Sequence, residues 1–249
     1  MKIKIDLNGG LGNQMFQYAF GRALSLYYNS ELYFNSSSIS LNPNRKLMLD
    51  RVFNLEIQVD KTIDYMIVSE KSSYYQDLEK YYYNLQRNNN YWFVGYWQNE
   101  AFFKLFEKEI REDFYLENTG VQKGTLLVQI RRGDFVNNSK HEYCDLSWYK
   151  NSISMMSEKT DIKTVIFASD DIDWVKNNFD FVEIEKIFLN TDEKETFEIM
   201  LTCQNFVISN SSFGWWGAWL SKAKNVICPK VWYPADTTWN TQLNNWIKI

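Results

Sequence analysis

Short apolar runs alternate with amphipathic stretches along the C-terminal half of the chain, and few folds accommodate such an alternation. Four apolar runs have the length of buried strands: residues 126–130, 164–168, 205–209 and 225–228. Four other stretches carry apolar residues at helical spacing: residues 146–157, 172–178, 195–204 and 213–221. Because strands alternating with helices favour a parallel sheet covered on both faces, we expect a Rossmann-like lobe of the α/β class.

The N-terminus reads as a strand, a glycine turn and a helix. Ile3, Ile5 and Leu7 alternate with polar residues, as in a strand with one buried face. The turn NGGLGNQ follows, and apolar residues then recur at helical spacing between positions 16 and 27.

Gly10 and Gly12 resemble the first two glycines of a dinucleotide-binding fingerprint. Met15 stands at the third glycine position, and no acidic residue ends a clear second strand. An NAD-dependent oxidoreductase is therefore a poor fit.

Size and composition limit the remaining choices. With 249 residues, 45% of them hydrophobic, the chain can bury a core as one large domain or as two lobes. A net charge of -4 argues against nucleic-acid binding, which needs a basic face. The three cysteines lack C-x-x-C spacing, so neither a disulfide framework nor a zinc site is indicated.

The chain shows no targeting or membrane-spanning pattern. MKIKIDL enters a strand without an apolar signal region, and no apolar run approaches the length of a bilayer. We expect a cytoplasmic protein, with peripheral contact at the inner face of a membrane left open. Residues 36–90 show no sustained period and receive no assignment, and the tail around Leu243 and Trp246 is interpreted as a short closing helix.

Polar segments follow directly on four predicted strands: NGGLGNQ, RRGD, SDD and NSSFGWW. In a doubly wound sheet, ligands bind beyond the carboxyl ends of the strands. Arginines, hydroxyls and glycines gathered at that edge predict a polyanionic ligand.

Arg131 and Arg132 come directly after the run at 126–130. Guanidinium groups are permanently charged, forked donors that match phosphate oxygens. Gly133 permits a tight turn, and Asp134 can orient an arginine. The alternative interpretation is an ordinary surface salt bridge.

Ser211 and Ser212 stand where a helix is expected to begin. Their hydroxyls and the free backbone N–H groups can bind phosphate, favoured by the helix dipole, or a serine can simply cap the helix. Asp170 and Asp171 can accept hydrogen bonds from a nucleoside, or one of them can cap the helix that begins near residue 172.

A metal site has weak support in the residues. Asp171 and Asp173 form a D-x-D pattern that can hold a divalent cation against a diphosphate. His141 is the only histidine, which excludes a histidine-based metal cluster, and no G-x-S-x-G elbow points to a serine triad. The tryptophans can stack on sugars, but for Trp216 and Trp219 we expect the core.

The chain resembles the alpha-1,2-fucosyltransferases of glycosyltransferase family 11, chiefly their bacterial branch. Six segments carry the resemblance: GGLGNQMFQYAFGRALS, VGYWQNEAFF, VQIRRGDF, HEYCDLSWYK, VIFASDDIDWVKNNF and FVISNSSFGWWGAWLSKAKNVICPKVWYP. RRGD followed at this distance by SDD and SNSSFGWW is the specific part, and the order and spacing agree.

The resemblance implies a GT-B-like architecture, with two Rossmann-like lobes whose parallel sheets face a central cleft. Residues 1–120 would form the acceptor-side lobe and residues 121–249 the lobe that binds GDP-fucose, with a tail that packs back on the first lobe. The implied reaction is metal-independent, inverting transfer of L-fucose from GDP-L-fucose to the 2-hydroxyl of a galactose-terminated glycan, lipid-linked or free. No cofactor is implied.

The resemblance also implies roles for individual residues. Arg131 would bind the donor diphosphate, and Asp134 is the nearest carboxylate for a catalytic role, as a base or by orienting an arginine. The remaining implied donor contacts are Gly10, Gly12, Asn13, Gln14, Arg132, Asp170, Asp171, Ser211, Ser212 and Phe213. The implied acceptor contacts are Trp97, Glu100 and His141.

One position departs from the family pattern. The motif usually reads H-x-R-R-G-D, and Gln129 stands at the histidine position. Because an amide carries no proton charge, this position is not expected to act as an acid or base. Two alternatives stay open: a protein that binds a nucleotide sugar without catalysis, and a metal-dependent sugar transferase that uses Asp171 and Asp173.

Overall fold

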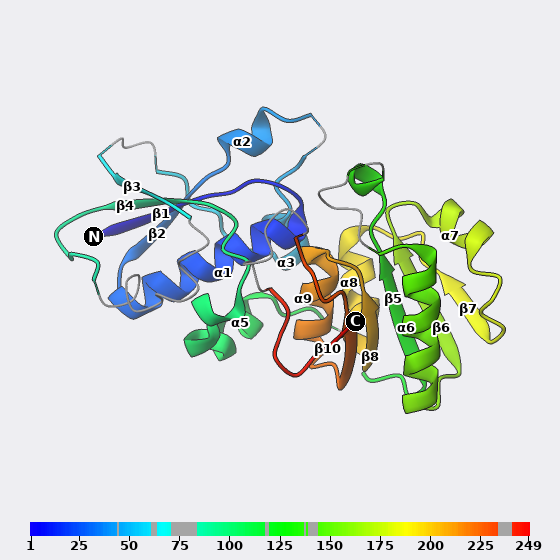
Figure 1. Cartoon of the computed structure of the whole chain (residues 1–249). Helices are drawn as coiled ribbons and strands as arrows, with labels where there is room; N and C mark the ends of the chain where they lie inside the picture. The colour runs from blue at the N-terminus through cyan, green and yellow to red at the C-terminus, as the bar shows by residue number, and fades with distance from the viewer. Residues whose placement is uncertain are drawn as a thin grey trace. The chain divides into compact units, whose positions relative to one another are not determined.

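The chain forms two compact units, Met1–Tyr115 and Leu116–Ile249. The computed structural model describes residues 1–43, 45–60, 64–70, 84–117, 120–136, 138, 144–233 and 241–249. Each unit is built on a parallel sheet with interleaved helices (Figure 1). The predicted α/β class with two Rossmann-like lobes is confirmed.

The first unit contains a parallel sheet in the order β2-β1-β4-β3. Its strands are β1 (Lys2–Asp6), β2 (Glu31–Asn35), β3 (Met66–Ser69) and β4 (Tyr91–Val94). The predicted N-terminal strand, turn and helix are β1, the loop at 7–10 and α1 (Leu11–Tyr28). Ile3 and Ile5 are fully buried, as their alternation with lysines predicts.

Short helices complete this unit, partly within the stretch that the sequence left unassigned. They are α2 (Ser37–Ser40), α3 (Leu49–Phe53), η2 (Glu100–Phe102), η3 (Lys104–Phe106) and α5 (Glu107–Asp113). Within the described residues of the whole chain, no helix is long and apolar enough to cross a membrane.

The second unit contains a parallel sheet in the order β10-β9-β8-β5-β6-β7. Its strands are β5 (Thr125–Ile130), β6 (Thr164–Ser169), β7 (Glu185–Phe188), β8 (Asn205–Ile208), β9 (Asn225–Cys228) and β10 (Ile247–Lys248). Its helices are η4 (Gly133–Phe135), α6 (Leu146–Lys159), α7 (Ile172–Asn178), α8 (Glu193–Thr202) and α9 (Ser212–Leu220). Each strand and helix predicted in this half is present, within two residues of its predicted bounds.

Two edge strands of this sheet differ from the prediction. The sequence did not indicate β7, whose side chains alternate between exposed and half-buried. The predicted closing helix of the tail is wrong, because this segment ends in the strand β10, which pairs with β9. Edge strands bury only part of their surface, so the apolar pattern that identifies a strand is weakest there.

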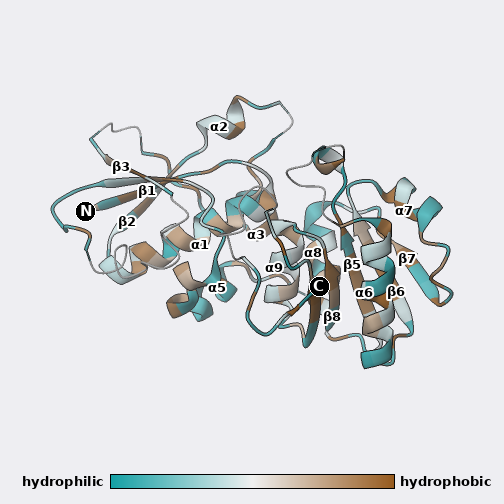
Figure 2. Cartoon of the chain, in the orientation of Figure 1, coloured by the Kyte–Doolittle hydropathy of each residue, from teal (hydrophilic) through white to brown (hydrophobic). Residues whose placement is uncertain are grey.

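The strand order has its topological switch beside β5. From β5 the chain moves outward through β6 and β7, then crosses back through α8 to β8 on the other side of β5. β5 is buried along its whole length, and Figure 2 shows it as hydrophobic. Its core neighbours include Ile153 and Met156 of α6. In open α/β sheets, ligands bind beyond the carboxyl ends of the strands at such a switch point. The residues that follow β5 and β8 are therefore candidates for a binding site.

Candidate functional site

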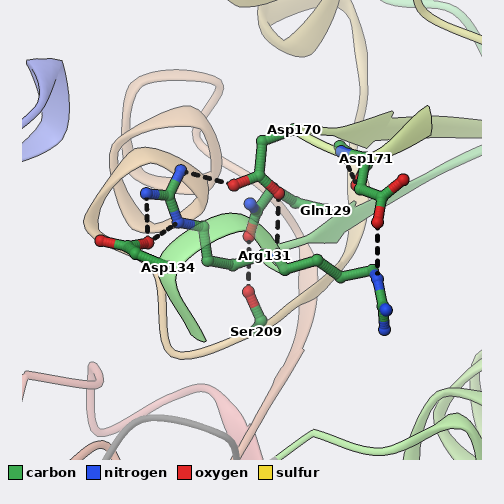
Figure 3. A network of polar contacts seen from close by, with 8 residues as sticks. Gln129, Arg131, Asp134, Asp170, Asp171 and Ser209 are labelled. Atoms are coloured by element: carbon green, nitrogen blue, oxygen red, sulfur yellow. Dashed lines mark hydrogen bonds and ion pairs between the residues drawn. The ribbon is translucent and has the colours of Figure 1, made fainter. Parts of the chain in front are cut away.

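Arg131 leaves the end of β5 with its guanidinium held between two carboxylates (Figure 3). Its Nη2 and Nε donate to Asp134 Oδ1 at 2.6 and 3.1 Å, and its Nη1 lies 2.8 Å from Asp170 Oδ2. The arginine side chain keeps 28% of its surface exposed. Its orientation is therefore fixed while part of the cation stays accessible to an anion.

Arg132 is held through both its backbone and its side chain. Its backbone N–H donates to Asp170 Oδ1 at 2.8 Å, and its Nε donates to Asp171 Oδ2 at 3.0 Å. The guanidinium carbon lies 3.6 Å from the centre of the Trp174 ring, a cation–π contact. Asp170 thus joins two consecutive residues after β5 to the end of β6.

Asp171, which pairs with Arg132, also caps the start of α7. Its Oδ1 accepts a hydrogen bond from the Trp174 N–H at 3.2 Å, so it is the N-cap of the helix. The predicted capping by one of the two aspartates is confirmed. Asp173 projects from the same helix and pairs with Lys176 at 3.0 Å. In the part of the chain that the structure describes, no three His, Cys, Asp or Glu side chains gather as a metal-binding group.

Gly133 is required by this packing. A Cβ at this position would lie 2.5 Å from Asp170 Oδ2, well inside van der Waals contact. Any side chain here would displace the carboxylate that holds both arginines. The glycine of RRGD therefore permits close packing of the turn against Asp170.

Gln129 lies in a buried position at the base of the site and is only 5% exposed. Its Oε1 accepts a hydrogen bond from Ser209 Oγ at 2.9 Å, which joins β5 to the residue after β8. A Cβ on Gly214 of α9 would lie 2.7 Å from the same Oε1. The Gln129 amide is therefore enclosed between the Ser209 hydroxyl and helix α9.

The predicted phosphate loop lies at the start of α9. Ser211 occupies the N-cap position without a capping hydrogen bond from its side chain, and Ser212 begins the helix. Phe213 packs on Phe197 of α8, with ring centres 4.5 Å apart. The hydroxyls of the serine pair therefore lie at the positive end of a helix dipole.

A small pocket opens beside the arginines, at the carboxyl ends of β5 and β8. Its lining includes Arg131, Arg132, Tyr149, Trp174, Ser209 and Asn210. Two cations at its wall suit an anionic ligand.

The sequence did not single out several residues of this pocket: Tyr149, Trp174, Ser209, Asn210 and Cys144. Ser209 ends the predicted strand 205–209 and Asn210 begins the NSSFG segment, so their position at the end of a strand was an available signal. Tyr149, Trp174 and Cys144 look like ordinary core or loop residues in one dimension. Burial raises the pKa of the Cys144 thiol, which makes it a poor nucleophile at neutral pH.

The predicted N-terminal donor loop surrounds the start of α1. Gly10 is the N-cap and its carbonyl accepts from the Asn13 and Gln14 N–H groups, while Gly12 is buried in the first turn. Asn13 Oδ1 accepts from Gln98 Nε2 at 2.8 Å. The Gln14 amide is fully buried and bonds to backbone atoms of Gly9, Lys46 and Met48. The Gln14 side chain therefore stabilises the loop through hydrogen bonds to its backbone.

The three predicted acceptor residues have different locations. Trp97 is 0% exposed and stacks on Phe20 at 4.1 Å, so its ring surface is not available to a sugar in this structure. Glu100 begins η2 and pairs with Lys104 at 3.2 Å. His141 lies outside the described residues. Trp216 and Trp219 are core residues, as predicted.

The family comparison matches the whole chain. Glycosyl transferase family 11 matches residues 1–249. An alpha-1,2-colitosyltransferase of Escherichia coli is 28% identical, with 98% of this chain and 97% of that protein covered. The O-antigen biosynthesis glycosyltransferase WbnK of Escherichia coli is 26% identical over 98% and 99% of the two chains. Galactoside alpha-(1,2)-fucosyltransferase 1 of Mus musculus is 22% identical, over 89% of this chain and 64% of that protein.

Solved structures agree in fold at low sequence identity. POFUT1 in complex with GDP-fucose has a TM-score of 0.50 and 15% identity, with 89% of this chain and 93% of that chain covered. The NodZ alpha-1,6-fucosyltransferase soaked with GDP-fucose has a TM-score of 0.50 and 10% identity, with coverage of 90% and 93%. These similarities bear on the architecture of the two lobes.

Proposed function

The chain belongs to glycosyl transferase family 11, and from this premise we propose that it transfers L-fucose from GDP-L-fucose to the 2-hydroxyl of a galactose-terminated glycan, with inversion and without a metal. The observation that carries the proposal is the orientation of Arg131 by Asp134 and Asp170 at the switch point of the second sheet. In this proposal, the unit Leu116–Ile249 binds the donor and the unit Met1–Tyr115 contributes to the acceptor site.

The proposed chemistry depends on charge that grows on the leaving group. As the bond between fucose and GDP breaks, negative charge accumulates on the diphosphate, and a cation already in place lowers the barrier. Arg131 supplies that cation, while Ser211, Ser212 and the first N–H groups of α9 provide further contacts to phosphate oxygens. Because the orienting carboxylates are in place before the donor binds, little reorganisation is needed.

The roles proposed for Asp134, Asp170 and Asp171 follow from the groups that each carboxylate contacts. Asp134 accepts two hydrogen bonds from Arg131, which supports an orienting role over that of a base. Asp170 and Asp171 hold the two arginines and the start of α7, so we expect them to act on the nucleoside and diphosphate mainly through these groups. Asp171 and Asp173 each have a partner of opposite charge, which does not favour a metal site at the D-x-D pattern.

Gln129 does not weaken the proposal. Its side chain is buried between Ser209 and Gly214, where it supports the loop after β8. A neutral amide can perform this supporting task, so its presence does not favour binding without catalysis.

The donor sugar and the acceptor are the finer parts of the proposal. One relative is named a colitosyltransferase and another is named an alpha-(1,2)-fucosyltransferase, so both sugars are tested as donors. Colitose lacks the 3-hydroxyl of fucose, and preference between the two GDP-sugars reports on recognition of that group. The O-antigen function in the name of another relative supports a polysaccharide acceptor.

The test is release of GDP from GDP-fucose or GDP-colitose, with and without a panel of β-galactosides, in EDTA. We expect acceptor-stimulated release that EDTA leaves unchanged, and a product whose new linkage is alpha-1,2. Loss of activity in EDTA that a divalent cation restores would favour the metal-dependent alternative. GDP binding without release from either donor across the panel would favour the non-catalytic alternative.

A further inference from the structure

The turn that follows β4 carries an exposed tyrosine. Tyr96 is the second residue beyond the strand and is 41% exposed. The described residues provide no hydrogen-bond, ion-pair or ring partner for its side chain. Because β1 and β4 are adjacent and parallel, their carboxyl ends meet at one edge of the first sheet. Tyr96 therefore belongs to the same edge as the glycine loop at 7–10, where ligands of such sheets bind.

The backbone that carries Tyr96 is fixed from two sides. The Glu70 carboxylate, just after β3, accepts the Tyr96 N–H on Oε2 at 2.6 Å and the Trp97 N–H on Oε1 at 3.0 Å. The Gly95 carbonyl accepts a hydrogen bond from Gln17 Nε2 of α1 at 2.9 Å. A Cβ on Gly95 would lie 2.7 Å from Glu70 Oε2, so the glycine lets the carboxylate reach the turn. The turn is thus attached to both β3 and α1.

The next residue of the turn has a strained backbone. Trp97 has a φ of 56°, in the left-handed region that a bulky residue rarely adopts. Its fully buried ring lies 4.1 Å from the ring centre of Phe20 and 5.8 Å from that of Phe93, and this packing holds the residue in place. Strain of this kind concentrates at ligand-binding sites. The turn therefore buries one aromatic ring as an anchor and leaves the ring before it exposed.

The chemistry of the turn favours a neutral sugar as its ligand. A sugar ring combines an apolar C–H face with hydroxyl groups at its rim, and tyrosine likewise combines an apolar ring with a polar tip. Glu70 places a carboxylate at the backbone of Tyr96, which disfavours an anionic group such as a diphosphate there. Because the backbone is already ordered, little conformational entropy is lost when a ligand stacks on the ring.

We propose that Tyr96 is an acceptor-binding residue, whose ring stacks on a sugar of the glycan acceptor. The inference rests on the proposed function and deepens it, since it places the aromatic contact one residue before the buried Trp97. Stacking on a sugar that does not react stabilises the ground state and the transition state alike. Its loss should therefore raise the acceptor KM and leave kcat unchanged.

The test is steady-state kinetics of the wild type, Tyr96→Ala and Tyr96→Phe with the β-galactoside that most stimulates GDP release by the wild type. Calorimetric titration with GDP and thermal unfolding accompany the kinetics. We expect Tyr96→Ala to raise the acceptor KM about tenfold, with kcat, GDP affinity and unfolding temperature near those of the wild type. Tyr96→Phe keeps the ring and should stay within about twofold of the wild-type KM. Tyr115→Ala is the matched control, since Tyr115 is a more exposed tyrosine of the same unit, and its acceptor KM should not change.

Five results would overturn the inference. An unchanged acceptor KM in Tyr96→Ala, with an active wild type, rejects the stacking role and leaves the proposed function standing. Equal losses in Tyr96→Ala and Tyr96→Phe assign the contact to the hydroxyl instead of the ring. Weaker GDP binding by Tyr96→Ala moves the residue to the donor site. An equal rise of KM in Tyr115→Ala shows an effect that is not specific to the turn. A wild type that no β-galactoside stimulates rejects the proposed acceptor, and this inference with it.

Discussion

Arg131 Nη1 lies 2.8 Å from Asp170 Oδ2, and this ion pair joins the first residue after β5 to the first residue after β6. The same carboxylate accepts the Arg132 backbone N–H through its other oxygen. One aspartate thus determines where both arginines lie at the switch point of the sheet.

Replacing Arg131 should remove catalysis while the fold is retained. We expect Arg131→Ala to lower turnover by about 100-fold or more, since a preoriented cation at the leaving group contributes on that scale. Arg131→Lys should recover little, because an ammonium cannot reproduce the forked geometry. Turnover is measured as acceptor-stimulated GDP release. Arg111→Ala serves as the control, because Arg111 pairs with Glu107 on α5 in the other unit; near-normal turnover of Arg131→Ala would refute the assignment.

Asp170→Asn should act through the arginines. The amide keeps an acceptor for the Arg132 N–H but loses the charge that holds Arg131, so we expect weaker GDP binding and about tenfold lower kcat/KM. Asp134→Asn should have a smaller effect, because the Asp134 side chain is more exposed than that of Asp170. Both variants are compared by steady-state kinetics and GDP titration. Equal losses in the two would argue against a special role for Asp170.

Gly214→Ala should destabilise the second unit. The new Cβ would meet Gln129 Oε1 at 2.7 Å and disturb its bond to Ser209. Overpacking outweighs the gain in helix propensity, and we expect a net loss of about 1–2 kcal/mol in the free energy of unfolding. Gly217→Ala in the same helix meets the flexible Met200 side chain and should lose less than about 1 kcal/mol. Urea unfolding of both variants measures the two losses. A larger loss for Gly217→Ala than for Gly214→Ala would contradict the packing argument.

Asp6→Asn should change how stability depends on pH. Burial raises the pKa of the Asp6 carboxyl above its ordinary value of 3.8, opposed by a 2.6 Å hydrogen bond from Asn35. The stability that the protonated carboxyl allows is fully present below pH 3.8 and is lost as the pH rises through the raised pKa. Because the amide carries no charge at any pH, the variant should gain stability relative to the wild type between about pH 4 and pH 7.

Urea unfolding of both proteins at several pH values tests this prediction. Tyr65→Phe, which removes a hydroxyl bonded to Asp60 in the same unit, is a control without a carboxyl change at position 6. A difference between Asp6→Asn and the wild type that stays constant with pH would show that the pKa of this carboxyl is the same in the folded and unfolded protein.

The central strands and helices of the second unit could be predicted because each buries a periodic apolar face, and burial leaves the same periodicity in the sequence. β10 could not, because a two-residue strand at an edge depends on the backbone of β9 rather than on its own pattern. The elements within residues 36–90 escaped prediction for a similar reason, since short helices such as α3 carry less than two turns of pattern.

The amino-acid sequence alone was enough to establish the alternation of strands and helices, the edge of the sheet at which RRGD, SDD and NSSFG gather, and the family through the spacing of these motifs. Which of their groups meet depended on the packing of the folded chain. That packing placed Trp97 in the core, enclosed Gln129 behind Ser209, and brought Tyr149 to the pocket from a helix that carries no motif. The spacing of apolar residues and the residue types of turns are local features of the sequence. A contact between β5, α6 and β8, by contrast, depends on how the whole sheet packs.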